Sequence, residues 1–237
     1  MSDGPAAATP RVSVIVPVYD EEATVARVVR RVLDGGRAAE VLVVDDGSQD
    51  GTLRVLEAIR DPRLRVLRHE RNRGKGAALR TGFAAATGDV IVVQDADLEY
   101  DPEDYPALLA PILEGKADAV FGSRFLGGPH RVLLFWHYAG NRFLTLLSNM
   151  ITNLNLTDME TGAKAFRADV LRGITLRQDR FGFEPEITAK LARAGARIWE
   201  ISVSYAGRTY AEGKKITWVD ALEVPWVLLR ARFFDPP

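Results

Sequence analysis

The sequence contains 237 residues, of which 47% are hydrophobic and 27% are charged. This is the composition of a globular protein, and the length suits one α/β domain with its own core. The formal net charge of −1 argues against nucleic acid as a partner, and the absence of cysteine excludes disulfides, thiolate metal sites and cysteine nucleophiles.

The two ends of the chain carry no clear targeting or spanning segment. Residues 1–10 lack the basic start and apolar stretch of a signal peptide, so we expect a disordered tail there. No uninterrupted apolar run reaches the length of about 20 residues that a membrane-spanning helix needs. These features predict a cytoplasmic protein.

The first half of the chain alternates regularly between two kinds of segment. Short runs rich in valine and isoleucine predict strands, and longer segments with helical periodicity or a proline start predict helices. In chain order we expect a strand at 12–16, a helix at 23–33, a strand at 41–44, a helix at 52–59, a strand at 64–67, a helix at 76–86, a strand at 90–93, a helix at 102–114 and a strand at 119–121.

The second half is less regular. We expect an amphipathic helix at 135–153, a strand at 163–166, a short helix at 169–171, a helix at 184–194, a strand at 198–205 and a terminal helix at 218–233. Strands that are apolar on both sides and alternate with helices predict a parallel sheet with helices on both faces. Sites in such sheets form at the carboxyl ends of the strands.

Acidic residues follow two of the predicted strands directly. Asp45 and Asp46 follow one strand, Asp95 and Asp97 follow another, and Glu99 lies two positions further on. Carboxylates gathered at one sheet edge repel one another and imply a cation. Because the ligands are oxygens, Mg²⁺ or Mn²⁺ is favoured, with substrate phosphates and water completing its coordination.

Some of these residues have structural alternatives. Asp101 precedes Pro102 and is typical of a helix cap. Asp45 fits the hydrogen-bonding partner of the Asp-Gly-Ser turn, whereas Asp46 fits either that turn or a contact to a nucleobase edge. The glycine-rich segment 72–76 opens a helix, and it predicts equally a phosphate site or a simple loop.

Four motifs in this order resemble those of the family 2 glycosyltransferases with the GT-A fold. They are Pro17-Val-Tyr-Asp-Glu21, Val44-Asp-Asp-Gly-Ser-Gln-Asp-Gly51, Asn72-Arg-Gly-Lys-Gly-Ala77 and Asp95-Ala-Asp97. Later segments, including Gly122-Ser-Arg-Phe125, Asp158-Met-Glu-Thr-Gly162 and Arg208-Thr-Tyr-Ala-Glu-Gly-Lys214, resemble the polyprenyl-phosphate branch of that family, to which the dolichol-phosphate mannose and glucose synthases belong.

The resemblance implies an α/β GT-A fold with a Rossmann-like, mostly parallel sheet in one domain at residues 11–216. A C-terminal amphipathic helix at 217–237 would follow, and it would lie at a membrane interface. The residues implied to line the nucleotide pocket are Pro17, Tyr19, Glu21, Val44, Asp46, Asp95, Ala96 and Asp97. Asp95, Asp97 and Glu99 would hold the metal, and Arg124, Arg208 and Lys214 would meet the donor diphosphate or the acceptor phosphate.

The implied reaction is metal-dependent, inverting transfer of a hexose from a nucleotide-diphosphate sugar, UDP-glucose or GDP-mannose, to a polyprenyl or dolichyl phosphate. A phosphate acceptor is already mostly a dianion at neutral pH and needs no base. A first alternative is a saccharide or small-molecule hydroxyl acceptor, for which Glu184 or Glu186 would serve as the base. A second is a nucleotidyltransferase, and a third is a non-catalytic nucleotide-sugar binder.

A lipid acceptor requires an apolar landing surface. Residues 132–136 and 224–234 mix bulky apolar side chains with arginine, which is typical of an interfacial segment and also of an ordinary core helix. Peripheral attachment to the cytoplasmic face of a membrane is therefore a hypothesis at this stage.

Overall fold

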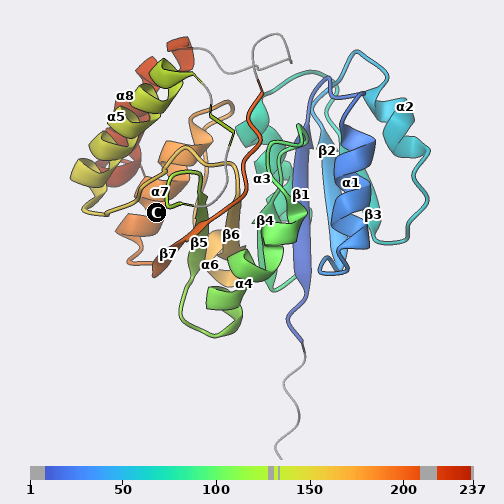
Figure 1. The fold of residues 1–237 in the computed structure, drawn as a ribbon, viewed down its shortest axis with the longest axis horizontal. Coiled ribbons are helices and arrows are strands. Elements are labelled where there is room, and N and C mark those ends of the chain that lie inside the picture. The colour runs from blue at the N-terminus through green and yellow to red at the C-terminus, as the bar shows by residue number, and fades with distance from the viewer. Residues whose placement is uncertain (1–8, 128–130, 133, 209–217, 236–237) are drawn as a thin grey trace, which may run out of the picture.

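The computed structural model describes residues 9–127, 131–132, 134–208 and 218–235, shown as a ribbon in Figure 1. The predicted tail at residues 1–10 lies almost wholly outside these ranges, as does Lys214.

A mixed sheet of seven strands forms the centre of the molecule, in the order β3-β2-β1-β4-β6-β5-β7. Its strands are β1 (Val12–Val18), β2 (Glu40–Asp45), β3 (Leu64–Arg68), β4 (Val90–Val93), β5 (Ala119–Ser123), β6 (Lys164–Arg167) and β7 (Ile198–Ser202). Every neighbouring pair is parallel except those made by β6, which runs antiparallel to both β4 and β5. The predicted α/β fold with a mostly parallel sheet is confirmed.

Helices cover both faces of the sheet, as expected from strands whose residues are buried on both sides. On one face lie α1 (Val25–Asp34), α2 (Thr52–Glu57) and α4 (Tyr105–Leu113), which share a core with the valines of β1 and β2. On the other face lie α3 (Lys75–Ala85), α6 (Ala168–Arg172) and α7 (Phe183–Arg193), which share a second core. Burial of these apolar surfaces is the main contribution to the stability of the fold.

The sequences of the central strands suit a position in the sheet that is covered on both faces. All seven residues of β1 and all six of β2 are buried, and most are valine, leucine or isoleucine. β-branched side chains pack well on a pleated surface, and a strand without a polar face requires cover on both sides. The carboxyl ends of β1, β2 and β4 therefore meet at the same edge of the sheet.

Local signals at the ends of two elements behave as predicted. Asp101 accepts a hydrogen bond from the backbone of Glu103 at 3.0 Å and caps a short 3₁₀ helix at Pro102–Asp104, which precedes α4. Asp45 accepts a hydrogen bond from the backbone of Ser48 at 3.0 Å, which confirms it as the partner of that turn.

Helices α5 (Phe135–Thr152) and α8 (Trp218–Phe233) lie side by side at one end of the sheet, far from β3 (Figure 1). Both leave large apolar side chains exposed. We call this surface the α5–α8 face; it is formed by Phe135, Trp136, Phe143, Leu146, Met150, Leu222, Trp226, Leu229, Phe233 and Phe234.

The predicted terminal helix is present, but its amphipathic character is not confirmed. Val224 and Leu228 of α8 are buried against the second core, while Leu222 and Trp226 on the other side are exposed. The outer side of the helix thus carries bulky apolar residues beside the exposed Glu223, whereas an amphipathic helix carries mainly polar residues there.

The close approach of α3 to β1 depends on a glycine. A Cβ atom added at Gly82 would lie 2.3 Å from Cγ2 of Ile15, which is fully buried. We therefore expect Gly82→Ala to lower the free energy of unfolding by about 1–3 kcal/mol, the usual cost of overpacking a core. Chemical denaturation of the purified protein would measure the loss.

Gly140 of α5 provides the matched control, because a Cβ atom there would meet nothing within 4 Å. Gly140→Ala should leave stability unchanged or raise it by up to about 1 kcal/mol, since alanine is the better helix former. Equal effects of the two substitutions would contradict this explanation of the α3–β1 contact.

Candidate active site

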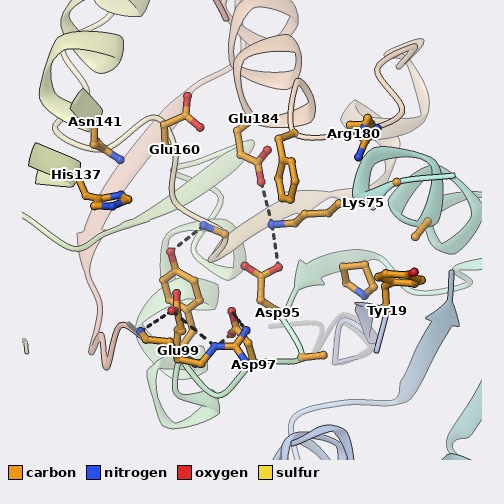
Figure 2. Close-up of a pocket in the computed structure, with 18 of the residues that line it drawn as sticks. Tyr19, Lys75, Asp95, Asp97, Glu99, His137, Asn141, Glu160, Arg180 and Glu184 are labelled. Atoms are coloured by element: carbon orange, nitrogen blue, oxygen red, sulfur yellow. Dashed lines mark hydrogen bonds and ion pairs between the residues drawn. The ribbon is translucent and has the colours of Figure 1, made fainter. Parts of the chain in front are cut away.

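A cavity of about 800 Å³ opens at the carboxyl ends of β1, β2 and β4, and Figure 2 shows many of the residues that line it. The predicted site residues that line it are Pro17, Tyr19, Glu21, Asp46, Asp95, Ala96, Asp97, Glu99, Arg124 and Arg208. Val44 does not line it; its side chain is fully buried in β2, where it packs close to Gly82. Lys214 lies outside the described residues.

The turn after β4 brings three carboxyl groups into one part of the cavity. Leu98 adopts a positive φ of 65°, and the backbone of Glu99 donates a hydrogen bond to Asp97 at 3.1 Å. Burial, followed by the charges of Asp95 and Glu99, raises the pKa of Asp97 to about 7, against the opposing charge of Arg208. Such a cluster of like charges calls for a positive partner.

The three carboxyl groups do not converge on one point. Asp95 is directed towards Lys75, whereas Glu99 accepts hydrogen bonds from the Tyr205 hydroxyl at 2.9 Å and from the backbone of Arg208 at 2.7 Å (Figure 2). Within the described part of the chain, no three acidic or histidine side chains lie close enough together to hold a metal ion. Asp95 and Asp97 remain suitable for an ion that also binds substrate oxygens, but the orientation of Glu99 does not suit a third ligand.

Arg208 connects two strand ends across the cavity. Its guanidinium lies 3.1 Å from the carboxylate of Glu21, which follows β1, and 3.3 Å from that of Asp97, which follows β4. The Nε atom of Arg208 is buried and has no hydrogen-bond partner among the described residues. An unsatisfied donor on a buried cation costs free energy, so this atom is suited to a further anionic ligand.

The orientation of Arg124 is fixed by hydrogen bonds to Asp158. Its guanidinium makes a bidentate pair with Asp158, with hydrogen bonds of 2.6 and 2.7 Å, and the backbone of Arg124 donates a third at 3.1 Å. The rings of Phe125 and Tyr205 lie 5.5 and 5.2 Å from its guanidinium carbon. Arg124 therefore presents a preorganised positive group to the cavity, with Asp158 as its counterion.

Asp46 has several hydrogen-bond partners within the protein, which the predicted contact to a nucleobase does not explain. Its carboxylate accepts hydrogen bonds from the backbones of Arg73, at 3.0 and 3.1 Å, and Gly74, at 2.7 Å, and from Nδ1 of His69 at 2.6 Å. Asp46 thereby holds the glycine-rich loop that begins α3. A contact to the nucleobase stays a prediction, and loop support is the role that the geometry shows.

Sequence reasoning missed Lys75. Its ammonium group lies 2.8 Å from Asp95 and 2.9 Å from Glu184, and it joins α3 to α7 across the cavity (Figure 2). Burial alone would lower the pKa of Lys75, but the charges of Asp95 and Glu184 outweigh it and raise this pKa well above its usual value. The available signal was a lysine between two glycines at a helix start, in a segment for which the sequence predicts equally a phosphate site or a simple loop.

Glu160 was also missed, although it lies within a motif that carried the resemblance. It lines the cavity, and its Oε1 atom is buried without a hydrogen-bond partner among the described residues. Burial and the charge of Glu184 raise the pKa of Glu160 to about 8, while Lys164 opposes the shift. A carboxyl in a turn before a strand gives no sequence signal of which way it faces.

The two carboxylates considered as bases have different surroundings. Glu184 lines the cavity, whereas Glu186 does not. Glu186 accepts hydrogen bonds from the backbones of Arg177, at 2.9 and 3.0 Å, and Gln178, at 2.8 Å, and its carboxylate lies 3.2 Å from Lys190. The structure thus uses Glu186 to hold the segment before α7, and only Glu184 remains a candidate base.

The strand order and the acidic turn after β4, with basic groups around it, are the features on which the comparison with known proteins bears. The model of a protein family described as glycosyl transferase family 2 matches residues 13–175. The chain belongs to this family.

The relatives of this family 2 glycosyltransferase agree with the predicted branch. It is 35% identical to an undecaprenyl-phosphate mannosyltransferase of Micrococcus luteus, over 86% of this chain and 87% of that protein. It is 32% identical to an undecaprenyl-phosphate 4-deoxy-4-formamido-L-arabinose transferase of Pseudomonas aeruginosa, again over 86% of this chain. The chain spans only 60% of the length of this second relative.

Solved structures confirm the fold. A glucosyl-3-phosphoglycerate synthase from Mycobacterium tuberculosis, in complex with Mn²⁺, UDP and glucosyl-3-phosphoglycerate, superimposes with a TM-score of 0.75. The match covers 96% of this chain and 81% of that one, at 22% sequence identity, and it shows that the two chains share a fold. Membership of the glycosyltransferase family also removes the alternatives of a nucleotidyltransferase and of a non-catalytic binder.

The role of Asp46 in holding the loop can be tested in the free protein. Asp46→Asn replaces one carboxylate oxygen with a donor that faces other donors, so the amide protons of residues 72–76 should exchange at least about fivefold faster, as expected for a loss of about 1 kcal/mol or more. Hydrogen exchange followed by mass spectrometry would measure this.

Asp50 gives the control, because it accepts hydrogen bonds from the backbones of Glu22 and Thr52 in a different loop. Asp50→Asn should leave exchange at 72–76 unchanged. Slow exchange at 72–76 in Asp46→Asn would show that Asp46 does not support the loop.

Proposed function

We propose that this enzyme transfers a hexose from a nucleotide-diphosphate sugar to a polyprenyl phosphate, with inversion, at a membrane surface. The observation that carries the proposal is the continuity between the cavity and the α5–α8 face. Trp136, Phe143 and Leu222 line the cavity and are also exposed on that face, with exposed fractions of 81%, 64% and 66%. An acceptor with a charged head and an apolar chain fits such a site.

The polar half of the cavity suits the donor. In the proposal, Pro17, Tyr19 and Asp46 lie at the nucleotide end, and Asp95 and Asp97 hold Mg²⁺ or Mn²⁺ against the diphosphate. The metal would supply charge neutralisation of the leaving diphosphate. The synthase from Mycobacterium tuberculosis with the same fold binds Mn²⁺ or Mg²⁺ with UDP, which supports this assignment.

The basic residues would neutralise the negative charge of phosphate oxygens that the metal ion does not neutralise. Arg208 is placed beside Asp97, and its buried Nε–H group has no hydrogen-bond partner among the described residues, the nearest carboxylate being that of Glu99 at 3.9 Å, so it is suited to an oxygen of the departing diphosphate. Arg124 is held in one orientation by Asp158, so it can bind a phosphoryl group without an entropic cost of ordering its side chain. Lys214 stays a predicted member of this group.

The state of Glu184 favours a phosphate acceptor over a hydroxyl acceptor. A hydroxyl must lose a proton to a base, but the carboxylate of Glu184 is paired with the ammonium of Lys75 at 2.9 Å. A phosphate monoester has a second pKa near ~6 and attacks as a dianion at neutral pH. The names of the undecaprenyl-phosphate transferases to which this chain is similar support the same acceptor.

The α5–α8 face supports a peripheral attachment to lipid. Trp226 and Phe233 are 64% and 59% exposed, and several bulky apolar side chains gathered on two neighbouring helices are typical of a binding surface. No helix within the described residues is long and apolar enough to cross a membrane. We propose that the face lies in the membrane interface, with the acceptor's chain in the lipid and its phosphate in the cavity; the cytoplasmic side of the membrane stays a prediction.

The reaction can be tested with a panel of donors and acceptors. UDP-glucose and GDP-mannose, each offered with polyprenyl phosphate and Mg²⁺ or Mn²⁺, should release nucleoside diphosphate with one of the donors. Asp97→Asn should reduce the rate by about 100-fold or more, because charge stabilisation at a departing group contributes several kcal/mol. Asp169→Asn, which affects an exposed ion pair with Arg167, serves as the control and should keep the rate.

A metal-independent rate that Asp97→Asn leaves unchanged would contradict the metal assignment. Turnover with a sugar hydroxyl and none with polyprenyl phosphate, lost in Glu184→Gln, would instead support the alternative acceptor.

The membrane proposal predicts a selective effect of removing apolar side chains. The double variant Trp226→Ser/Phe233→Ser should lose flotation with anionic liposomes and activity on long-chain acceptor in vesicles, while activity on a short, water-soluble prenyl phosphate persists. Trp199→Ser is the matched control, since Trp199 is exposed on β7 outside the α5–α8 face. Flotation that is equal in all three proteins would show that another surface, or none, binds the lipid.

A further inference from the structure

The loop that carries Lys75 is built to hold this residue in one place. The Asp46 carboxylate fixes the backbones of Arg73 and Gly74 on one side. On the other side, the backbone of Ala77 donates a hydrogen bond to the carbonyl of Asp179 at 3.0 Å. The loop is thus anchored both to the end of β2 and to the segment before α7.

Two glycines permit this anchoring. Gly74 has a φ of +101°, which side chains rarely allow, and a Cβ atom at Gly76 would lie 2.2 Å from the carbonyl oxygen of Gln178. Lys75 is the residue between them, and it begins α3 with its side chain directed into the cavity (Figure 2).

The ammonium group of Lys75 is placed where it neutralises the acidic edge of the site. It lies 2.8 Å from Oδ1 of Asp95 and 2.9 Å from Oε1 of Glu184, and its side chain is only 17% exposed. Asp97 in turn has the guanidinium of Arg208 at 3.3 Å. Each of the two carboxylates assigned to the metal therefore has a cationic side chain beside it in the substrate-free protein.

A divalent ion and the Lys75 ammonium compete for the same carboxylate. A metal ion bound by Asp95 would lie within a few ångströms of the ammonium group, and like charges at that distance repel strongly in a partly buried site. A donor diphosphate changes the balance, since it brings negative charges that attract both cations. Metal and diphosphate should then enter together.

We propose that the ammonium group of Lys75 pairs with Asp95 in the absence of substrate and thereby suppresses binding of the metal ion until the donor diphosphate binds. This inference rests on the proposed metal site at Asp95 and Asp97. The glycine-rich loop then has a role that neither the motif nor the family assigns to it here: it holds the ammonium group of Lys75 beside the proposed metal ligand Asp95. Coupling of this kind is reciprocal, so the metal also strengthens binding of the diphosphate.

The test is the affinity for Mn²⁺ in the absence of nucleotide, measured by titration with detection of free Mn²⁺ by electron paramagnetic resonance. Lys75→Gln keeps hydrogen-bond donors for Asp95 and Glu184 but removes the charge. We expect it to bind Mn²⁺ at least about fivefold more tightly than the wild type, the lower end of usual coupling energies. The gain in Mn²⁺ affinity on adding UDP or GDP should be smaller in this variant.

Further variants separate this role from a structural one. Lys75→Arg keeps the charge and should restore the weak Mn²⁺ binding of the wild type, whereas Lys75→Met should behave as Lys75→Gln. Lys116→Gln removes an exposed lysine that pairs with Glu114, and it should change nothing. Thermal unfolding of each variant establishes which are folded, and the second neutral variant serves if the first is not.

Mn²⁺ binding that is equal or weaker in folded Lys75→Gln and Lys75→Met overturns the inference. If those variants behave so while the wild type transfers sugar with Mn²⁺, the proposed function survives and only the role of Lys75 fails. If neither the wild type nor any variant binds Mn²⁺ with or without nucleotide, the metal site fails and the inference with it.

Discussion

The electrostatic constraint at the end of β4 is the interaction on which the rest of the site depends. Asp95, Asp97 and Glu99 lie within one turn at a largely buried edge, where burial and then the repulsion of Asp95 and Glu99 raise the pKa of Asp97 to about 7. Carboxylates in such a place persist only with positive partners. The protein supplies these from distant parts of the chain, with Lys75 from the start of α3 and Arg208 from the segment after β7.

These cations also connect the strands and helices that form the site. Arg208 ties the ends of β1 and β4 together through Glu21 and Asp97, and Lys75 ties α3 to α7 through Glu184. Arg124 fills a third position, fixed by Asp158 beneath it. A cavity lined by groups that are already oriented can stabilise a developing negative charge without reorganising, which is the main electrostatic contribution to catalysis. In the proposed function, the apolar α5–α8 face would bring the lipid chain of the acceptor to the same cavity.

Much of this arrangement could be predicted from the sequence, because it depends on local patterns. Apolar runs ending in Asp95 and Asp46 placed these residues at the sheet edge, and Asp101 before Pro102 identified the helix cap. The strand β6 in antiparallel orientation left no comparable signal, since a four-residue run has no direction of its own. The nature of α8 was also ambiguous, because a helix that is apolar on both sides has the same composition whether its outer side faces core or lipid.

The parts of the site that escaped prediction depend on orientation and on contacts between distant segments. Nothing local tells that Glu184 faces the cavity while Glu186, two residues on, turns inward to Lys190. Likewise, the partners of Asp46 belong to a loop before another element. The role of Lys75 depends on its ion pairs with Asp95 and Glu184, which lie far from it in the sequence. Sequence patterns predicted which residues gather at the sheet edge, and only the tertiary structure shows how their charges are paired.

Transfer of the sugar to a lipid phosphate, with a metal ion at Asp95 and Asp97, is the proposal to test first. The most direct measurement is ³¹P nuclear magnetic resonance of the products formed from the accepted donor, polyprenyl phosphate and Mg²⁺. We expect the phosphomonoester signal of the lipid to be replaced by that of a phosphodiester, with the sugar inverted at its anomeric carbon and one nucleoside diphosphate released for each product. A lipid phosphomonoester that persists while the sugar is transferred to a hydroxyl group would contradict the proposal.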